Sequence, residues 1–272
     1  MTPIIFDGRE FARQKEKLLK GKVSQLKRQG MTPKLGSILV GDNPSSKLYT
    51  SLKKKAAERI GAVLEIKEFP VSVSVDQLNQ LIRKLNKDES VHGIMLQLPL
   101  PPPISNHQSQ IINSISPEKD VDGLREDSQF RPATVKAILE IIDYALKFVR
   151  RPLREAPLKV TVVGSSGMVG TRLVKELRIL NYEVGEADIE TKDLKSKTQD
   201  ADVLISATGV PDLIKSDMVK IGAIVIDVGS PEGDVDFPKV CKKAAFITPV
   251  PGGVGPVTIS CLLGNLVEAA VV

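Results

Sequence analysis

The stretch LKVTVVGSSGMVG, residues 158–170, decides the fold of the second half of this chain. Its first seven residues are typical of a buried strand, and the run TRLVKELRIL that follows is typical of a helix. Between them, Gly164, Gly167 and Gly170 leave the main chain open to a pyrophosphate, and the helix N-terminus supplies N–H donors. A tight turn packing a helix on a sheet is the alternative. Asp188, 18 residues beyond Gly170, favours dinucleotide binding.

Strands and helices alternate along the chain, which predicts parallel α/β sheets with helices on both faces. The expected helices cover residues 8–29, 45–60, 75–86 and 134–149. The expected strands cover residues 35–40, 63–69, 93–98, 158–164, 183–188, 201–209, 222–229 and 245–250. We also expect the apolar tail, CLLGNLVEAAVV, to form a helix that packs on the body. The predicted fold class is α/β, with an N-terminal βαβ domain and a C-terminal Rossmann-like, doubly wound parallel-sheet domain.

Composition narrows the classes of function. The net charge of +5 and pI of about 9.1 admit nucleic acid or a polyanionic small molecule as partner. With no tryptophan and 4% aromatic residues, stacking groups for nucleic acid are missing, so we expect none to bind. Two cysteines and two histidines give little support to a metal site or a disulfide framework. The N-terminus lacks signal-peptide features and no apolar run reaches roughly 18 residues, so we expect a cytoplasmic protein without membrane contact.

The stretch SKLYTSLKKK, residues 46–55, raises the question of whether its three lysines are a solvated face. At roughly 100° per residue, Leu48, Leu52, Ala56 and Ile60 form one apolar stripe that includes Tyr49. Lys53 falls roughly 60° from the centre of the stripe, while Lys54 and Lys55 point further away. A lysine at the edge of a buried face has a lowered pKa and can exchange protons near neutral pH.

Several segments in order resemble the bifunctional methylenetetrahydrofolate dehydrogenase/cyclohydrolase family. They are VGDNPSSKLYTSLKKKAAERIGA, GIMLQLPLPPP, PEKDVDGL, ADVLISATG, GAIVIDVG and FITPVPGGVGPVT. The resemblance runs from about residue 4 to the end of the chain, and PVPGGVGPVT and the Tyr-x-x-x-Lys helix are its most specific parts. It implies a catalytic folate-binding domain at residues 1–132 and a dinucleotide-binding domain at residues 133–251. Residues 252–272 would form a C-terminal segment and helix that pack back toward the catalytic domain.

The resemblance also implies the site. Folate and a nicotinamide, NAD or NADP, would bind in a cleft between the domains of a homodimer. Tyr49, Lys53, Gln97 and Asp122 match the catalytic set, in which the glutamine accompanies the lysine and the aspartate binds the pterin ring. Taken alone, a residue such as Gln97 is more often simply a polar strand end, and Asp120 and Asp122 have an alternative as capping residues of Asx turns. The implied substrate-binding residues are these four together with Leu98, Pro99, Pro251, Gly252 and Gly253, and the substrates are tetrahydrofolate derivatives with or without a polyglutamate tail.

The implied cofactor-binding residues follow the strands of the second half. They are Gly164, Ser165, Ser166, Val169, Gly170, Asp188, Ile189, Ala207, Thr208, Gly209, Gly229 and Ser230. The sequence departs from the family pattern at two of these places. Ser165 stands where members that use NADP commonly have arginine, and Asp188-Ile189 stands where a His-Ser pair is frequent. Because a carboxylate binds a free ribose diol and repels a 2′-phosphate, we expect NAD to be preferred, although Arg172 or Lys192 could restore phosphate binding.

A third departure follows the DVDG motif. Relatives carry a longer loop with an Asn-x-Gly element before a Pro-Cys-Thr-Pro turn, whereas this chain has LREDSQFRPATVKA. Ala133 and Val135 replace the cysteine and the second proline, and Thr134 is retained. Three alternatives stay open from the residues: a cyclohydrolase without dehydrogenase activity, a folate- or nucleotide-binding protein that has lost catalysis, and a shikimate-type dehydrogenase.

Overall fold

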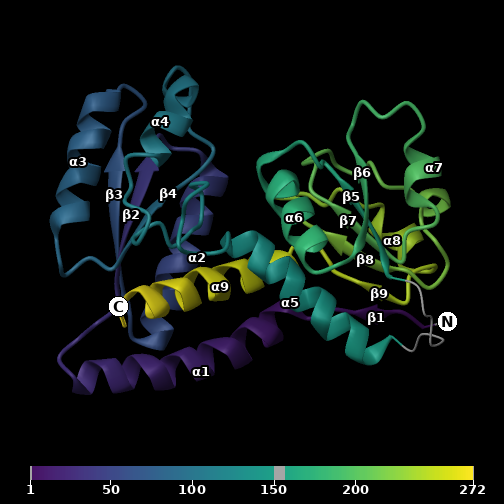
Figure 1. Cartoon of the computed structure of the whole chain (residues 1–272), viewed down its shortest axis with the longest axis horizontal. Coiled ribbons are helices and arrows are strands. Elements are labelled where there is room, and N and C mark those ends of the chain that lie inside the picture. The colour runs from purple at the N-terminus through teal and green to yellow at the C-terminus, as the bar shows by residue number, and fades with distance from the viewer. Residues whose placement is uncertain (1, 150–156, 272) are drawn as a thin grey trace. The chain divides into compact units, whose positions relative to one another are not determined.

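The computed structural model describes residues 2–149 and 157–271 (Figure 1). Contacts divide the chain into two compact units. Residues 12–133 and 259–272 form the three-stranded unit, and residues 1–11 and 134–258 form the six-stranded unit. The chain passes between units within α1 (Gly8–Arg28), at the start of α5 (Ala133–Phe148) and within α9 (Val254–Ala269).

The three-stranded unit is built on a short parallel sheet. Strand β2 (Lys34–Val40) lies between β3 (Val63–Phe69) and β4 (Gly93–Leu96). Its other elements are α2 (Pro44–Ile60), α3 (Val75–Lys87), η1 (Ile104–His107) and α4 (Gln108–Ile112). One face of the sheet forms a core with α3, η1 and α4, in which Ile38, Ile94 and Leu96 pack near Leu78, Ile82 and Ile111. Since side chains alternate along a strand, Met95 points to the opposite face, where α2 lies.

Local signals fix the ends of α2 and α3. The Asn43 side chain accepts a hydrogen bond from the Ser46 N–H at 3.0 Å, and Pro44 follows in the first turn of α2. Gly61 ends α2 in the left-handed conformation, with φ of 84°. Ser74 begins α3 with a capping box to Gln77. These ends agree with the predicted helices to within one residue at each end.

The six-stranded unit is a parallel sheet in the order β1-β9-β8-β7-β5-β6. Its strands are β1 (Ile4–Ile5), β5 (Lys159–Val163), β6 (Glu183–Ala187), β7 (Val203–Ser206), β8 (Ile224–Asp227) and β9 (Phe246–Ile247). Its remaining helices are α6 (Met168–Ile179), α7 (Leu194–Thr198), η2 (Ser216–Met218) and α8 (Phe237–Val240). Figure 1 shows α6 on one side of this sheet and α7 and α8 on the other. The predicted doubly wound α/β class is confirmed.

Four strand predictions were too long by two or three residues at their C-terminal ends, and one strand was missed. Strand β7 ends at Ser206 rather than at residue 209, and β8 ends at Asp227 rather than at residue 229. Strand β4 stops at Leu96 rather than at residue 98, and β9 spans only Phe246–Ile247 rather than residues 245–250. Pro99 and Pro249 follow, and proline has no N–H to donate to a ladder. Strand β1 was not predicted, because two residues are too few to show a period; its pairing with β9 identifies it.

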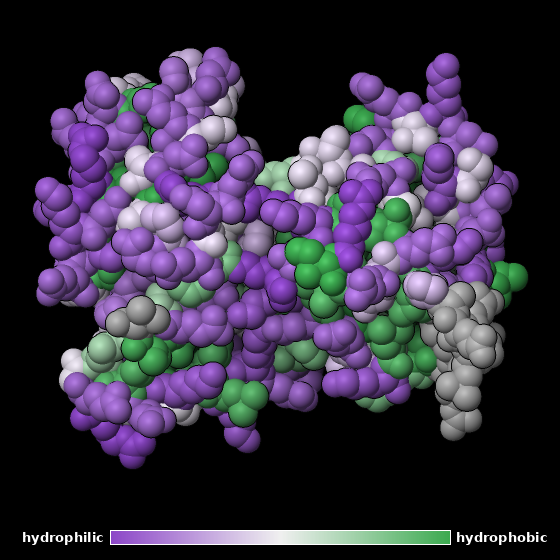
Figure 2. All heavy atoms as spheres, viewed as in Figure 1, coloured by the Kyte–Doolittle hydropathy of each residue, from purple (hydrophilic) through white to green (hydrophobic). Residues whose placement is uncertain are grey.

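The face of the molecule in Figure 2 is mostly hydrophilic, with hydrophobic residues in smaller, separate patches. Within residues 2–149 and 157–271, no helix combines the length and the apolar character needed to cross a membrane.

An ion pair joins α1 to α2 inside the three-stranded unit. The Glu16 side chain is 9% exposed and accepts two hydrogen bonds of 2.7 Å from Nε and Nη2 of Arg59. A bidentate pair of this kind is stronger than an ordinary surface contact, because the carboxylate has lost most of its water.

We therefore predict that Arg59→Ala lowers the free energy of unfolding by about 1–3 kcal/mol, since Glu16 would keep its burial and lose its donors. Urea denaturation of the full chain measures the change. Lys55→Ala, an exposed position one turn earlier on α2, is the matched control and should stay within about 0.5 kcal/mol of wild type. Equal effects of the two changes would contradict the prediction.

Candidate functional site

The Lys53 amine is buried inside the three-stranded unit. The residue is 9% exposed and lies on the face of α2 that covers the sheet. Its Nζ donates to the Gln97 side-chain oxygen at 3.0 Å and lies 3.2 Å from the Met95 sulfur. Burial lowers the pKa of Lys53 below its usual value, and the charge of Asp122 opposes that shift. The amine can therefore lose its proton at a lower pH than an exposed lysine can.

Gln97 immediately follows strand β4 and holds a fixed orientation. Its Nε2 donates to the Leu98 carbonyl at 2.7 Å, which leaves its oxygen facing Lys53. The Gln97 N–H still donates to the Ile38 carbonyl at 2.9 Å, so the residue continues the ladder by one bond. The prediction that Gln97 meets Lys53 at a strand end agrees with these contacts, although the regular strand stops one residue earlier. Leu98 is partly buried, and Pro99 beside it is exposed.

Asp122 is partly buried in the loop that leads to α5. Burial raises the pKa of its carboxyl group, the positive charge of Lys53 opposes this, and the nearby Asp120 adds to it. The effects of Lys53 on Asp122 and of Asp122 on Lys53 show that the two groups interact electrostatically. The structure thus brings Lys53, Gln97 and Asp122 into one polar cluster.

The apolar stripe predicted for α2 is wrong in its N-terminal half. Leu48 and Leu52 are exposed, whereas Ser46, Thr50 and Lys53 are buried along with Ala56, Ala57 and Ile60. The helix therefore turns a small and polar face to the sheet, and Lys53 lies within that face rather than at its edge. Tyr49, four residues earlier on the same side of the helix, is partly buried. Lys54 and Lys55 are exposed, as predicted.

In the six-stranded unit, the predicted cofactor residues all follow the carboxyl ends of parallel strands. Residues 164–170 follow β5, residues 188–189 follow β6, residues 207–209 follow β7 and residues 229–230 follow β8. Strand β5 lies between β6 and β7, so the chain reverses its direction of travel across the sheet there. Ligands of open parallel sheets bind at such a switch point.

The glycine loop after β5 has the tight backbone that a dinucleotide pyrophosphate requires. Gly164 has φ of 86°, and a Cβ at Gly170 would lie 2.0 Å from the Gly164 carbonyl oxygen. Helix α6 begins directly after this loop and presents its N-terminus at the same strand end. These residues fit a bound dinucleotide, with the pyrophosphate held by backbone N–H groups.

Asp188 closes the end of this loop. Its Oδ2 accepts from the Ser165 hydroxyl and from the Ser166 N–H, each at 3.0 Å. The Thr191 hydroxyl and the Asp188 N–H lie 2.8 Å apart, which fixes the turn after β6. A carboxylate thus occupies the two donors that an anion would otherwise use. Ile189 beside it is 58% exposed.

Pro251, Gly252 and Gly253 form the turn between β9 and α9. Gly252 has φ of 112°, and the Gly253 N–H donates to the Pro249 carbonyl at 2.8 Å. A Cβ at Gly253 would lie 2.6 Å from that carbonyl oxygen, so the turn accepts no larger residue there. Pro251 is exposed.

Two residues that contact or support the predicted site residues, Met95 and Asp234, were not identified from the sequence. Met95 contacts the Lys53 amine, and its only signal was its place in an apolar strand. Asp234 is fully buried, and its Oδ2 accepts from the Ser206 hydroxyl and from the N–H and hydroxyl of Thr208 at 2.7–2.8 Å. It therefore fixes the loop after β7. The acidic run EGDVD could have indicated such a role, because loop carboxylates commonly bind backbone N–H groups.

In the part of the chain that the structure describes, no group of three or more His, Cys, Asp or Glu side chains is arranged to hold a metal ion.

Comparison with known proteins agrees with both units. The family model for the tetrahydrofolate dehydrogenase/cyclohydrolase catalytic domain matches residues 6–122, and the model for the NAD(P)-binding domain of the same family matches residues 132–272. The chain is 41% identical to the bifunctional protein FolD of Bacillus licheniformis, over 99% of this chain and 98% of that protein.

Solved structures give the same result. The chain resembles the bifunctional FolD enzyme of Campylobacter jejuni with a TM-score of 0.88 and 37% identity, covering 97% of each chain. It resembles the methylenetetrahydrofolate dehydrogenase-cyclohydrolase of Trypanosoma brucei, solved with NADP and an inhibitor, with a TM-score of 0.90 and 32% identity, covering 98% of this chain and 97% of that one. Together with the buried lysine, the strand-end glutamine and the glycine loop, these matches establish that the chain belongs to the tetrahydrofolate dehydrogenase/cyclohydrolase family.

Proposed function

We propose that this protein is a bifunctional folate enzyme with two successive activities. It oxidises 5,10-methylenetetrahydrofolate to 5,10-methenyltetrahydrofolate with NAD or NADP, and it hydrolyses the product to 10-formyltetrahydrofolate. In this proposal residues 1–132 carry the folate chemistry, residues 133–251 hold the dinucleotide, and residues 252–272 complete the catalytic domain. Full-length similarity to bifunctional relatives supports it.

The observation that carries the proposal is the buried amine of Lys53 against the oriented oxygen of Gln97. In the hydrolysis, the oxygen of water bonds to the methenyl carbon and the bond from that carbon to N5 breaks. One proton of the water passes to N5, and the other is released. Because burial lowers the pKa of Lys53, its amine reaches the neutral form at a lower pH than an exposed lysine does, and that form can accept the proton. Gln97 holds one N–H of the amine, which leaves the nitrogen lone pair available in a defined direction.

In the oxidation, the residues of this chain mainly position the folate and the dinucleotide relative to each other. When bound, the nicotinamide supplies the hydride-accepting chemistry. The glycine loop and the strand ends of the six-stranded unit hold the dinucleotide, and Asp234 keeps the loop at Thr208 in shape. We infer that Asp122 accepts hydrogen bonds from the amino and N–H groups of the pterin ring, and that Tyr49 supports Lys53. Leu98, Pro99 and Pro251 to Gly253 form walls for the substrate.

We further infer that the enzyme prefers NAD. The Asp188 carboxylate occupies the Ser165 hydroxyl and the Ser166 N–H, which are donors a 2′-phosphate would need. A ribose diol can instead donate to that carboxylate. Arg172 and Lys192 are the two cations that the sequence offers for offsetting this repulsion. A homodimer, a cytoplasmic location and a polyglutamate tail on the substrate stay predictions that rest on the sequence and the family.

Two alternatives to a bifunctional enzyme are a protein that only hydrolyses the methenyl compound and a protein that binds its ligands without catalysis. Both would follow if the shortened loop after Asp122 had impaired the site. An absorbance assay of methylenetetrahydrofolate with NAD or NADP, followed by hydrolysis of the methenyl compound, separates the cases. Turnover in both steps is expected; hydrolysis without reduction of either nucleotide would show that only the cyclohydrolase survives.

We predict that Lys53→Met lowers the rate of methenyl hydrolysis by about 10²- to 10⁴-fold, because the methionine side chain has similar length and no proton-accepting nitrogen. The stopped-flow decay of methenyltetrahydrofolate absorbance measures the rate. Lys54→Met, on the exposed side of the same helix, is the control and should retain the wild-type rate. A Lys53→Met enzyme that hydrolyses normally would disprove the role of the amine.

The pH dependence of hydrolysis tests the same group. The neutral amine is the active form, so the rate should rise with pH through the lowered pKa of Lys53. Asp122 raises that pKa, so Asp122→Asn should lower it further and move the rising limb to lower pH. Rates at saturating substrate across the pH range provide the measurement. If the rising part of the pH–rate profile stays in place or moves to higher pH in Asp122→Asn, Lys53 is not the group that accepts the proton.

For the cofactor, we predict a higher kcat/KM with NAD than with NADP in the wild type. Asp188→Ser should raise kcat/KM for NADP by about 10- to 100-fold, because it removes the charge facing the 2′-phosphate and frees the Ser166 N–H. Asp193→Ser, the same charge change at the start of α7, is the matched control and should leave the ratio unchanged. Equal or better turnover of NADP by the wild type would overturn the preference.

A further inference from the structure

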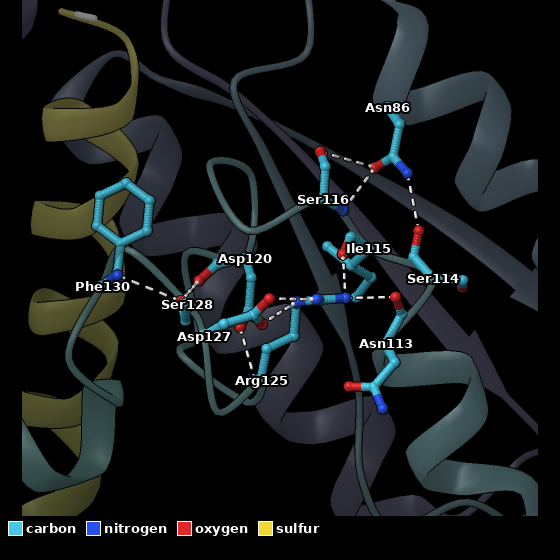
Figure 3. A network of polar contacts seen from close by, with 10 residues as sticks. All are labelled: Asn86, Asn113, Ser114, Ile115, Ser116, Asp120, Arg125, Asp127, Ser128 and Phe130. Atoms are coloured by element: carbon cyan, nitrogen blue, oxygen red, sulfur yellow. Dashed lines mark hydrogen bonds and ion pairs between the residues drawn. The ribbon is translucent and has the colours of Figure 1, made fainter.

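The loop that follows Asp122 lies between the two family-model matches, residues 6–122 and 132–272, and its sequence departs from the family pattern. No helix or strand is assigned among the described residues between α4 and α5, that is, from residue 113 to residue 132. The carboxylate that we assign to the pterin ring therefore sits in irregular backbone. Its position has to be fixed by side chains, and Figure 3 shows that Arg125 is central to their network.

All three guanidinium nitrogens of Arg125 have partners. Nε and Nη2 each donate at 2.7 Å to the Asp127 carboxylate. Nη1 donates to the carbonyls of Asn113 and Ile115, the latter at 2.9 Å. The Arg125 side chain is 13% exposed, whereas that of Asp127 is 62% exposed. The contact to the Ile115 carbonyl is partly buried, whereas those to Asn113 and Asp127 are exposed. We therefore expect the Ile115 contact to contribute more than the exposed ion pair.

The segment that Arg125 binds is itself anchored to α3. The Asn86 side chain donates to the Ser114 carbonyl at 2.8 Å and accepts from the Ser116 N–H at 3.1 Å. Lys119 donates to the carbonyls of Leu85, Asn86 and Asp88 at the end of the same helix. Because α3 packs in the core against the sheet, residues 113–119 form a rigid support. Arg125 ties the loop to that support.

The main chain of Arg125 connects this anchor to the neighbourhood of Asp122. Its N–H donates at 2.8 Å to Oδ2 of Asp120, which is fully buried. The other oxygen of Asp120 has no hydrogen-bond partner among the described residues. The Asp120 carbonyl accepts from the Gly123 N–H and the Ser128 hydroxyl, both at 3.0 Å. The backbone is therefore held on both sides of Asp122, by Asp120 before it and by Arg125 after it.

We propose that Arg125 is a positioning residue of this enzyme, which fixes the Asp122 carboxylate for the folate ring by clamping the short 120–128 loop to the 113–115 turn. This inference rests on the proposed function, because it takes Asp122 as the folate-binding carboxylate. It also explains how the chain keeps a defined site with a shortened loop. The guanidinium group reaches two carbonyls and one carboxylate at once, a geometry that lysine cannot reproduce.

The test compares steady-state kinetics of Arg125→Ala, Arg125→Lys and Asp127→Ala with those of the wild type. Arg125→Ala should raise KM for methylenetetrahydrofolate by about 10- to 100-fold, since small displacements of a binding group have effects of this size. KM for NAD should stay within about twofold, because the loop belongs to the other unit. Arg125→Lys should recover part of the loss, because an ammonium can still reach the carbonyls. Asp127→Ala, which removes only the exposed pair, should remain within about threefold of the wild type.

Calorimetric binding of folate to each variant provides a readout besides turnover, and thermal unfolding shows whether each variant is folded at the assay temperature. A loss in Arg125→Ala that raises both KM values together, or that Asp127→Ala reproduces in full, would show a general structural role and overturn the inference. So would an unchanged folate KM. If Arg125→Ala does not fold, Arg125→Lys should show a smaller rise in KM for methylenetetrahydrofolate, again without a change in KM for NAD. A wild-type enzyme without turnover of methylenetetrahydrofolate would instead refute the proposed function, and the inference with it.

Discussion

The burial of the Lys53 amine is the constraint on which the site in the three-stranded unit depends. An ammonium group loses much of its hydration when it is placed at 9% exposure against a thioether and an amide. The desolvation cost is smaller for the neutral amine than for the ammonium ion. Burial therefore favours the neutral amine, which is the form that can accept a proton. Gln97 offers it a neutral oxygen, while the negative charge of Asp122 acts against the effect of burial by favouring the ammonium form. Helix α2 can bring Lys53 there only because its inward face carries small and polar residues.

The six-stranded unit uses buried acids for a different purpose. Asp234 holds Ser206 and Thr208, and Asp227 accepts three hydrogen bonds of 2.9–3.0 Å from the N–H groups of Gly229, Asp234 and Val235. Burial raises the pKa of Asp227 to about 6, and these three donors act against the rise. Both carboxylates fix loops at the carboxyl ends of strands, where backbone N–H groups would otherwise lack partners. The loops at these strand ends are thus shaped by buried acids, whereas the partly buried Asp188 accepts from the Ser165 hydroxyl and the Ser166 N–H of the glycine loop.

Many of the helices and strands, and part of the candidate site, could be predicted from the sequence. Strand β3 was predicted with its observed ends, and α2 and α3 within one residue, because caps and periodicity are local signals. Lys53 lies on the buried side of its helix as predicted, yet the stripe used to argue for that position was wrong: Leu48 and Leu52 are exposed and Thr50 is buried. Periodicity finds the apolar side of a helix, but it cannot recognise a helix whose buried side carries Ser46, Thr50 and Lys53. Met95, Asp234 and Arg125 escaped notice because each acts through a contact distant in sequence or through main-chain atoms.

The sequence by itself determined the alternation of strands and helices, the glycine loop after β5 and the residue types available for proton transfer. Each of these depends on residue types and their spacing within a short segment. Only the tertiary structure decided that β1 pairs with β9, that Nζ of Lys53 lies against the Met95 sulfur across 42 positions of the chain, and that Arg125 binds the carbonyls of residues 113 and 115. These contacts depend on the register of parallel strands and on the path of an irregular loop. Both are fixed by packing among segments that no local pattern relates to one another.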